Sequence, residues 1–167
     1  MPIAPYRIHA VRYAHRKCTT SEAFYGDHHN GPMTMDYFVW TLTNGSETVV
    51  VDLGFTEAVG TARGRQFLRP IDRGLAEVGV DCRKVQHVVL SHFHYDHVGN
   101  YALFPNATFY VQDAEMAFYT GRNVSLGAFR RSVEVEDICA LIRLNYEGRL
   151  VFVDGEREVV PGVSVHK

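Results

Sequence analysis

The feature that most constrains this chain is the stretch SHFHYDHVGN, Ser91 to Asn100, which places three histidines and one aspartate within six residues. It directly follows the apolar run VQHVVL, which predicts a short buried strand. In α/β proteins the loop beyond the carboxyl end of such a strand usually carries functional groups, because the sheet holds it in place. The stretch therefore predicts an α/β fold with its site at this strand end.

The polar side chains of this loop form a candidate metal site. They are His92, His94, Asp96 and His97. Imidazole nitrogens and carboxylate oxygens suit Zn²⁺, and also Mn²⁺ or Fe²⁺. Four ligands so close in sequence do not easily reach one ion, so a turn could present the first two to one metal and the last two to a second. A polar cluster beside a buried strand is costly without a partner, which favours metal binding over a solvated surface group.

The rest of the chain predicts a mixed α/β layered architecture in a single domain over residues 1–167. MDYFVWTLT and ETVVVDLG are rich in β-branched and aromatic residues, and Asn44-Gly45 between them predicts a hairpin. Asp113 is predicted to cap a helix over DAEMAFYT. The remaining predictions are a strand over 6–13, loops over 14–34 and 60–70, helices over 70–79 and 134–146, and three short strands over 149–167.

Composition excludes several classes of partner. The formal net charge is −2 and the pI is near 6.5, so no basic field predicts nucleic-acid binding. No apolar run is long enough to predict a membrane span. The N-terminal residues MPIAPYRIHA lack a signal-peptide pattern, and we therefore expect a cytoplasmic protein.

The motif HFHYDH resembles the HxHxDH motif of the metallo-β-lactamase superfamily, whose members are αββα sandwiches with two metal ions. The segments MDYFVWTL, HFHYDHVGN, FPNATFYVQDAEMAF and RLVFVDGEREVVPGVSVHK are similar to the N-acyl homoserine lactonase branch. The resemblance extends from about residue 30 to the end. It implies a hydrolase that opens the lactone ring of N-acyl homoserine lactones.

The resemblance also implies roles for particular residues. His92 and His94 would bind one metal ion, and Asp96 and His97 the other, with zinc favoured and manganese or iron as alternatives. Asp96 would also deliver a proton to the leaving group. Asp52, in VVVDLG, would orient the ligands from behind, although the family usually has threonine at the next position and this chain has leucine.

Part of the family's site has no counterpart in these 167 residues. The family has a Gly-Gly-His stretch, a bridging aspartate, a last histidine and a substrate-side tyrosine further along, so we expect the chain to cover roughly the N-terminal half to two-thirds of the sandwich, truncated after Lys167. We expect residues 1–167 alone to be inactive. With one sheet mainly unpaired, its apolar inner face predicts aggregation or a homodimer.

Three alternatives stay open at this point. The same superfamily includes hydrolases of thioesters, β-lactams and other lactones. A nuclease is disfavoured, because the arginines at positions 63, 65, 69 and 73 are interpreted as solvated loop residues and the overall charge is acidic. The last alternative is an inactive metal-binding fragment that lacks the C-terminal ligands.

Overall fold

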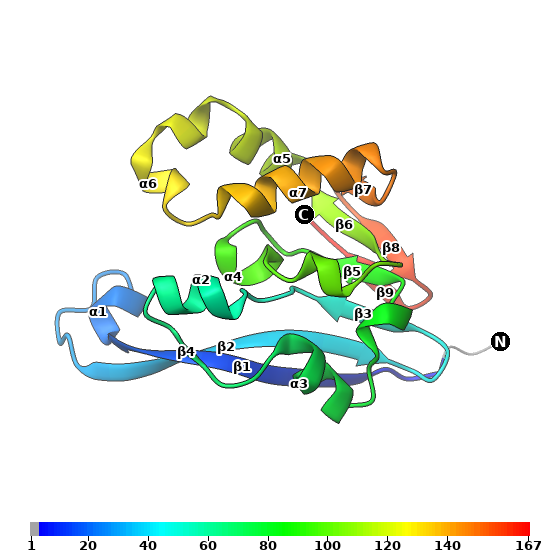
Figure 1. The fold of residues 1–167 in the computed structure, drawn as a ribbon, viewed down its shortest axis with the longest axis horizontal. Helices are drawn as coiled ribbons and strands as arrows, with labels where there is room; N and C mark the ends of the chain where they lie inside the picture. Colours follow the sequence, from blue (N-terminus) through cyan, green and yellow to red (C-terminus); the bar gives the residue numbers. More distant parts are fainter. Residues whose placement is uncertain (1–3) are drawn as a thin grey trace.

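A computed structural model describes residues 4–167 of the chain. In these residues the strands form one seven-stranded sheet and a separate two-stranded hairpin, which Figure 1 shows together with the helices. The first three residues belong to the N-terminal segment discussed above and lie outside the described residues. No helix in residues 4–167 is long and apolar enough to cross a membrane.

One half of the large sheet is antiparallel. Its strands are β1 (Arg7–Thr19), β2 (Pro32–Thr43), β3 (Thr48–Val51) and the short β4 (Gln66–Phe67). The predicted hairpin is confirmed, because the turn between β2 and β3 contains Asn44 and Gly45, and Gly45 has a φ of 91°. The Asn44 side chain accepts hydrogen bonds from the N–H groups of Ser46 and Glu47 at 3.1 and 2.8 Å, which fixes the turn.

The other half of the sheet is parallel. β3 pairs with β5 (His87–Val89), β5 with β6 (Thr108–Gln112), and β6 with β7 (Leu150–Val153). Helices occupy the connections, as parallel strands require. These helices are α2 (Glu57–Ala62), α3 (Ile71–Glu77), α4 (Tyr95–Val98), α5 (Asp113–Thr120), α6 (Gly127–Arg130) and α7 (Val135–Tyr146). The remaining elements are α1 (Thr20–Ala23), β8 (Arg157–Val160) and β9 (Val163–Val165). The predicted α/β class is confirmed.

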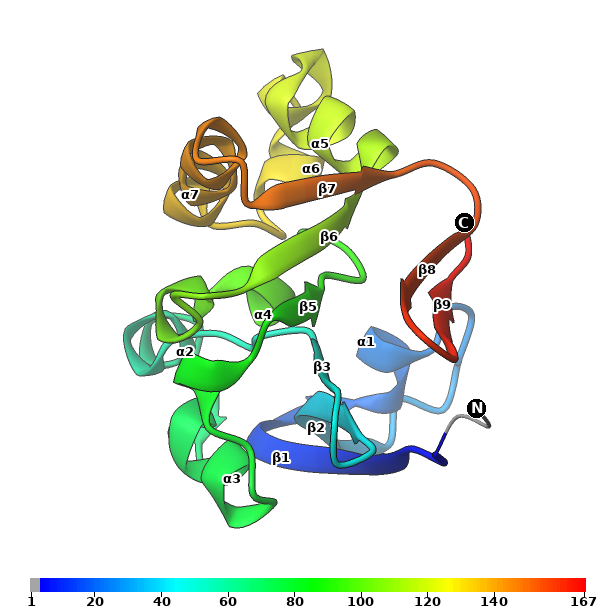
Figure 2. The ribbon, with the colours of Figure 1, turned by 90° about the vertical axis from the view of Figure 1, so that its right-hand side faces the viewer.

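The large sheet has two faces, which we name by what covers them. The helix face carries Val50, Val88 and Phe109, which are neighbours in the strand register and are fully buried. The hairpin face is the opposite side, where the β8–β9 hairpin helps to bury Val49 and Tyr110. Figure 2 shows α2, α3 and α7 on one side of the sheet and β8–β9 on the other.

The β8–β9 hairpin leaves most of β1 and β2 uncovered on the hairpin face, although Leu42 of β2 still packs against the buried cluster there. In the uncovered part, Ile8 is 63% exposed, Trp40 42% and Phe38 36%. The expectation that the whole apolar inner face is exposed is therefore wrong over β3 and β6, where Val49 and Tyr110 are buried. Within the described residues, the exposed apolar part of this face is confined to β1 and β2.

The predicted loop over residues 14–34 is wrong for most of its length. β1 continues to Thr19 and β2 begins at Pro32, with the short helix α1 between them. The β1–β2 register shifts at a bulge between Arg12 and Ala14. Because a bulge changes the phase of the alternating pattern, the sequence signal for the strand ends there although the pairing continues.

The other predicted boundaries differ from those of the structure by fewer residues. Residues 60–70 contain the end of α2 and strand β4 rather than a loop alone. The helix predicted over 70–79 is confirmed as α3, with Pro70 as its N-cap instead of its first residue. Gln112, not Asp113, is the N-cap of α5, and Asp113 lies in the first turn, where a negative charge is favourable. The helix over 134–146 and the three final strands are confirmed as α7, β7, β8 and β9.

Candidate metal centre

The candidate ligands lie at the edge of the sheet where the parallel strands end. Because β3 and β5 run in the same direction, their carboxyl ends share this edge. Asp52 directly follows β3, and the loop from Ser91 to His97, which we call the metal loop, follows β5. The Leu90 N–H donates to the Tyr110 carbonyl of β6 at 3.0 Å and fixes the start of the loop.

Three imidazole rings crowd together in the metal loop. The centroid of the His92 ring lies 3.8 Å from that of His97 and 4.5 Å from that of His94. Burial, followed by the charges of His97 and His94, lowers the pKa of His92 to about 4. His92 is therefore neutral at pH 7, which is the form that binds a metal ion.

His97 is protonated at pH 7, unlike the neighbouring His92. Burial opposes a charge on His97, but hydrogen bonds to Asp52 and Asp96 outweigh burial and raise the pKa of His97 to about 9. Nδ1 of His97 lies 2.7 Å from Oδ2 of Asp52, and Nε2 lies 3.4 Å from Oδ2 of Asp96. Burial also opposes the charge on Asp96, yet the contact with His97 lowers the pKa of Asp96. The three groups form a carboxylate–imidazole–carboxylate chain.

Asp52 joins the end of β3 to the metal loop. Its φ is 60°, a left-handed conformation that aspartate tolerates better than most residues. Its carboxylate accepts hydrogen bonds from the Ser91 N–H and the Ser91 hydroxyl, both at 2.8 Å, in addition to the contact with His97. These are the contacts that an orienting residue needs. Ser91 is not among the predicted site residues, because its one signal in the sequence is its position next to the histidine motif.

Two more residues that hold the loop had no signal in the sequence. Oε2 of Glu115, in α5, accepts a hydrogen bond from the Phe93 N–H at 2.8 Å. The buried Tyr13, in β1, donates its hydroxyl to the carbonyl oxygen of Asp96 at 3.3 Å. Both contacts depend on how distant elements pack, which no local motif encodes.

Gly99, the C-cap of α4, is required by close packing and not by its backbone conformation. Its φ of −60° is ordinary for a helix and open to any residue. A Cβ atom at this position would lie 3.0 Å from both the Gly54 carbonyl oxygen and the Phe55 Cα. Glycine is therefore required because α4 packs directly on the backbone that follows Asp52.

The predicted division into two ligand pairs is not visible in these side chains. His92 lies closer to His97 than to His94. In residues 4–167, no group of three or more His, Cys, Asp or Glu side chains is arranged so that it could hold a metal ion. The donor set still fits a divalent cation by its chemistry, since His92 is neutral, Asp96 is ionised and Asp52 orients the ring of His97. The ligand roles of these residues stay predictions.

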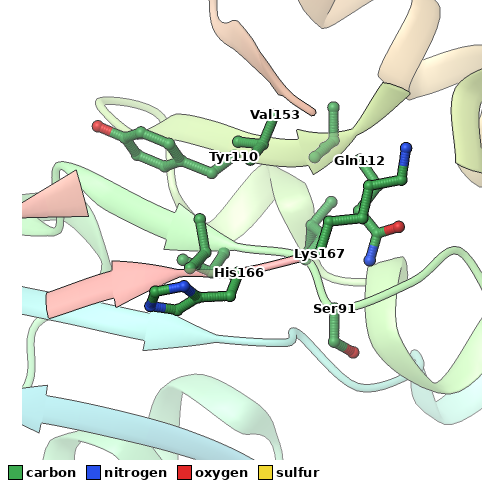
Figure 3. A pocket seen from close by; sticks show the side chains of 10 residues that line it. Ser91, Tyr110, Gln112, Val153, His166 and Lys167 are labelled. Atoms are coloured by element: carbon green, nitrogen blue, oxygen red, sulfur yellow. The ribbon is translucent and has the colours of Figure 1, made fainter. Parts of the chain in front are cut away.

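A cavity of about 300 Å³ lies beside the metal loop (Figure 3). Its wall includes Ser91 at the start of the loop, Tyr110 and Val153 from β6 and β7, and the residues after β9, His166 and Lys167. His166 directly follows β9, and its Nε2 lies 3.8 Å from a carboxylate oxygen of the exposed Glu156. The cavity therefore reaches the metal loop through Ser91.

Comparison with known protein sequences finds a family match, a lactonase and a probable metallo-hydrolase. A family model described as the metallo-beta-lactamase superfamily matches residues 31–157. An N-acyl homoserine lactonase from a Bacillus species is 33% identical over 91 residues, which are 54% of this chain and 31% of that protein. A probable metallo-hydrolase from Methanocaldococcus jannaschii is 40% identical over 48 residues, which are 29% of this chain and 24% of that protein.

Solved structures agree with the family match. A quorum-quenching N-acyl homoserine lactone lactonase superposes with a TM-score of 0.76 at 20% identity, over 98% of this chain and 63% of that chain. A dizinc quorum-quenching lactonase with a bound product superposes with a TM-score of 0.65 at 14% identity, over 96% and 62%. The chain thus spans less than two thirds of these relatives and has their fold. With a family model that covers most of its length, the chain belongs to the metallo-beta-lactamase superfamily.

Proposed function

We propose that this protein is a metal-dependent hydrolase that opens the lactone ring of N-acyl homoserine lactones, a quorum-quenching activity. The hydrolase class follows from the superfamily. The substrate is supported by a lactonase that is 33% identical over 91 residues and by lactonases that share the fold. The observation that carries the proposal is the clustering of the metal loop's histidines beside Asp52, with His97 bonded to its carboxylate.

Each residue of the cluster has a role in this proposal. His92 and His94 would hold one cation, and Asp96 and His97 a second, with zinc favoured over manganese or iron. When bound, such cations polarise a carbonyl group and make water acidic. Asp52 holds Nδ1 of His97, so that Nε2 would be the nitrogen to coordinate a cation, which would displace the proton that the ring carries beside the two carboxylates.

Asp96 is proposed to move the proton of the reaction. The low pKa of its carboxyl group keeps it ionised before the lactone reacts. It can therefore accept the proton that the attacking water releases and carry it to the departing ring oxygen. Ring opening turns that oxygen into a hydroxyl group, so one water is consumed and no other reactant is needed.

A polypeptide limited to residues 1–167 is proposed to bind metal weakly and to lack activity. In residues 4–167 no three donors are arranged to hold an ion, and two protein ligands per metal give weak binding. The exposed apolar surface over β1 and β2 is the reason to propose self-association of such a polypeptide. We further propose a cytoplasmic location and, from the net charge of −2, no nucleic-acid partner.

The test uses the protein at its full gene-encoded length. Elemental analysis is expected to find about two divalent ions per chain. The His92→Ala variant should lose metal and nearly all lactonase activity. The matched control is His87→Ala, because His87 lies in β5 outside the metal loop, where it contacts the Tyr110 hydroxyl at 3.1 Å. Full metal content and activity in the His92 variant would overturn the metal site.

Substrate class is tested separately on the same preparation. N-hexanoyl homoserine lactone, nitrocefin and a glutathione thioester are compared by kcat/KM. The lactone should be turned over fastest, and faster turnover of either other compound would assign the chain to another branch of the superfamily. Asp96→Asn should lower kcat far more than it changes KM, because the amide cannot carry the proton.

A further inference from the structure

We propose that Tyr95 is a positioning residue for the metal loop and that Arg63 and Arg65 hold it in place. Tyr95 lies between two candidate ligands, His94 and Asp96. The inference rests on the proposed metal site and adds the residues that set its geometry. It replaces the interpretation of Arg63 and Arg65 as solvated loop residues.

The ring of Tyr95 is buried and enclosed by two neighbours. It is 8% exposed. The guanidinium carbon of Arg63 lies 4.0 Å from the ring centroid, the geometry of a cation–π contact. The Phe55 ring stacks on it with centroids 5.6 Å apart and an interplanar angle of 28°. The plane of the Tyr95 ring is therefore fixed.

The hydroxyl of Tyr95 is also held. It accepts a hydrogen bond from Nε of Arg65 at 3.0 Å and lies 3.3 Å from the hydroxyl of Tyr37 in β2. Phenylalanine at position 95 would keep the ring contacts and lose both of these. The hydroxyl thus gives the loop a tie to β2 and to the segment between α2 and β4.

Arg63 connects the metal loop to the segment before α7. Its Nε donates to Oε1 of Glu134 at 2.7 Å. Two more of its N–H groups donate to the carbonyl oxygens of Arg131, at 3.0 Å, and Val133, at 3.3 Å. Ser132 lies between these two residues, and its carbonyl oxygen accepts a hydrogen bond from the Tyr95 N–H at 2.9 Å. One arginine therefore secures both the tyrosine ring and the segment that binds the tyrosine backbone.

These contacts act on the ligands through the chain itself. The Tyr95 N–H belongs to the peptide plane shared with His94, and the held ring fixes the Cα–Cβ bond of Tyr95. Together they constrain the backbone from which the His94 and Asp96 side chains leave. Metal ligands must be held within about 0.5 Å of their working positions, so release of Tyr95 should weaken metal binding without removing a ligand.

The test compares Tyr95→Phe with Tyr146→Phe at the full gene-encoded length. Tyr146 is 89% exposed and lies at the end of α7, so it is a matched control. Cobalt(II) is titrated in competition with a chelator and followed by its visible absorption, and thermal unfolding is measured on the metal-free protein. We expect Tyr95→Phe to weaken the affinity for one cobalt ion about tenfold and to shift its absorption bands, as loss of supporting contacts does. Tyr146→Phe should match the wild type.

A second pair of variants separates positioning from simple stability. Arg63→Lys keeps the charge but loses the planar set of donors, and it should weaken cobalt binding as well. Arg69→Lys alters an exposed ion pair with Glu77 and should leave cobalt binding unchanged. If Tyr95→Phe and Arg63→Lys lower only the unfolding temperature and bind cobalt as the wild type does, the positioning role is wrong. A wild-type protein that binds no cobalt would instead overturn the proposed function.

Discussion

The two faces of the large sheet are built from the same kinds of residue but are buried to different degrees. Phe109 on the helix face is fully buried, whereas Trp40 on the hairpin face is 42% exposed. Both lie in strands of one sheet and both are aromatic, so composition does not distinguish them. The difference lies in the cover, since α7 and the other helices close one face and β8–β9 covers only part of the other.

This contrast explains which side of the candidate site is held in place by packing. The metal loop rests on the helix face, whose core includes Phe93, Tyr95 and Val98 of the loop and of α4. The cavity beside it is lined by Tyr110 and Val153, which belong to the cluster on the hairpin face, and by His166 and Lys167 after β9. One side of the site is therefore held by the packed helix face, and the other side borders this cavity.

The largest expected effect is on the helix face. Phe109→Ala should lower the free energy of unfolding by about 4 kcal/mol, because it leaves a cavity in a fully buried position. Chemical denaturation of the metal-free protein measures the change. A loss below about 1 kcal/mol would show that the helix face is not the rigid side of the sheet.

The second prediction concerns a charge buried on the helix face. Burial, with a smaller contribution from Glu134, raises the pKa of Asp137 to about 6, and its Oδ2 has no hydrogen-bond partner within the described residues. The folded protein therefore holds this proton more tightly than the unfolded chain, whose aspartate pKa is about 3.9. Stability should fall as the pH rises from about 4 to 6 and stay low above that.

Removal of the Asp137 charge should restore the stability that the protein loses as the pH rises. Asp137→Asn is expected to be more stable than the wild type by about 2 kcal/mol at pH 7, and the gain should shrink toward zero at pH 4. Glu136→Gln, an exposed change in the same helical turn, removes only the smallest contribution to the pKa shift of Asp137 and is the control, which should show a much weaker trend. Denaturation curves at several pH values decide the matter, and a gain that is equal at pH 4 and 7 would contradict the assignment.

The smallest expected effect is on the uncovered part of the hairpin face. Trp40→Thr should change the free energy of unfolding of residues 1–167 by less than about 0.5 kcal/mol, as is usual for exposed positions. The same change should reduce self-association of this polypeptide, which sedimentation measures. If Trp40→Thr were as costly as Phe109→Ala, the two faces would be equally covered.

Much of the fold could be predicted from local patterns. The hairpin at Asn44-Gly45, the helices α3 and α7 and the strands β7 to β9 all carry turn residues or apolar spacing that one segment reveals. The second half of β1 could not be predicted, because the bulge after Arg12 changes the alternation and the pairing partner is needed to continue the strand. Local patterns report periodicity, and they do not report pairing.

The residues of the candidate site also fall into those with a local sequence signal and those without one. The motif picked out His92, His94, Asp96 and His97, and the resemblance to the superfamily picked out Asp52 in VVVDLG. Tyr13, Glu115 and Arg63 could not be found, since each reaches the metal loop from another element. Long-range support of this kind depends on the packed fold.

The contacts of Arg63 also have a consequence for the order of assembly during synthesis. Arg63 and Glu134 are 71 residues apart in the chain, so their contact closes a long loop and forms late. Glu134 is synthesised 39 residues after Tyr95, which takes roughly 2 to 8 seconds at common rates of translation. For that interval the histidines exist without the segment that holds Tyr95. A metal ion that arrives early would therefore meet ligands not yet held in place.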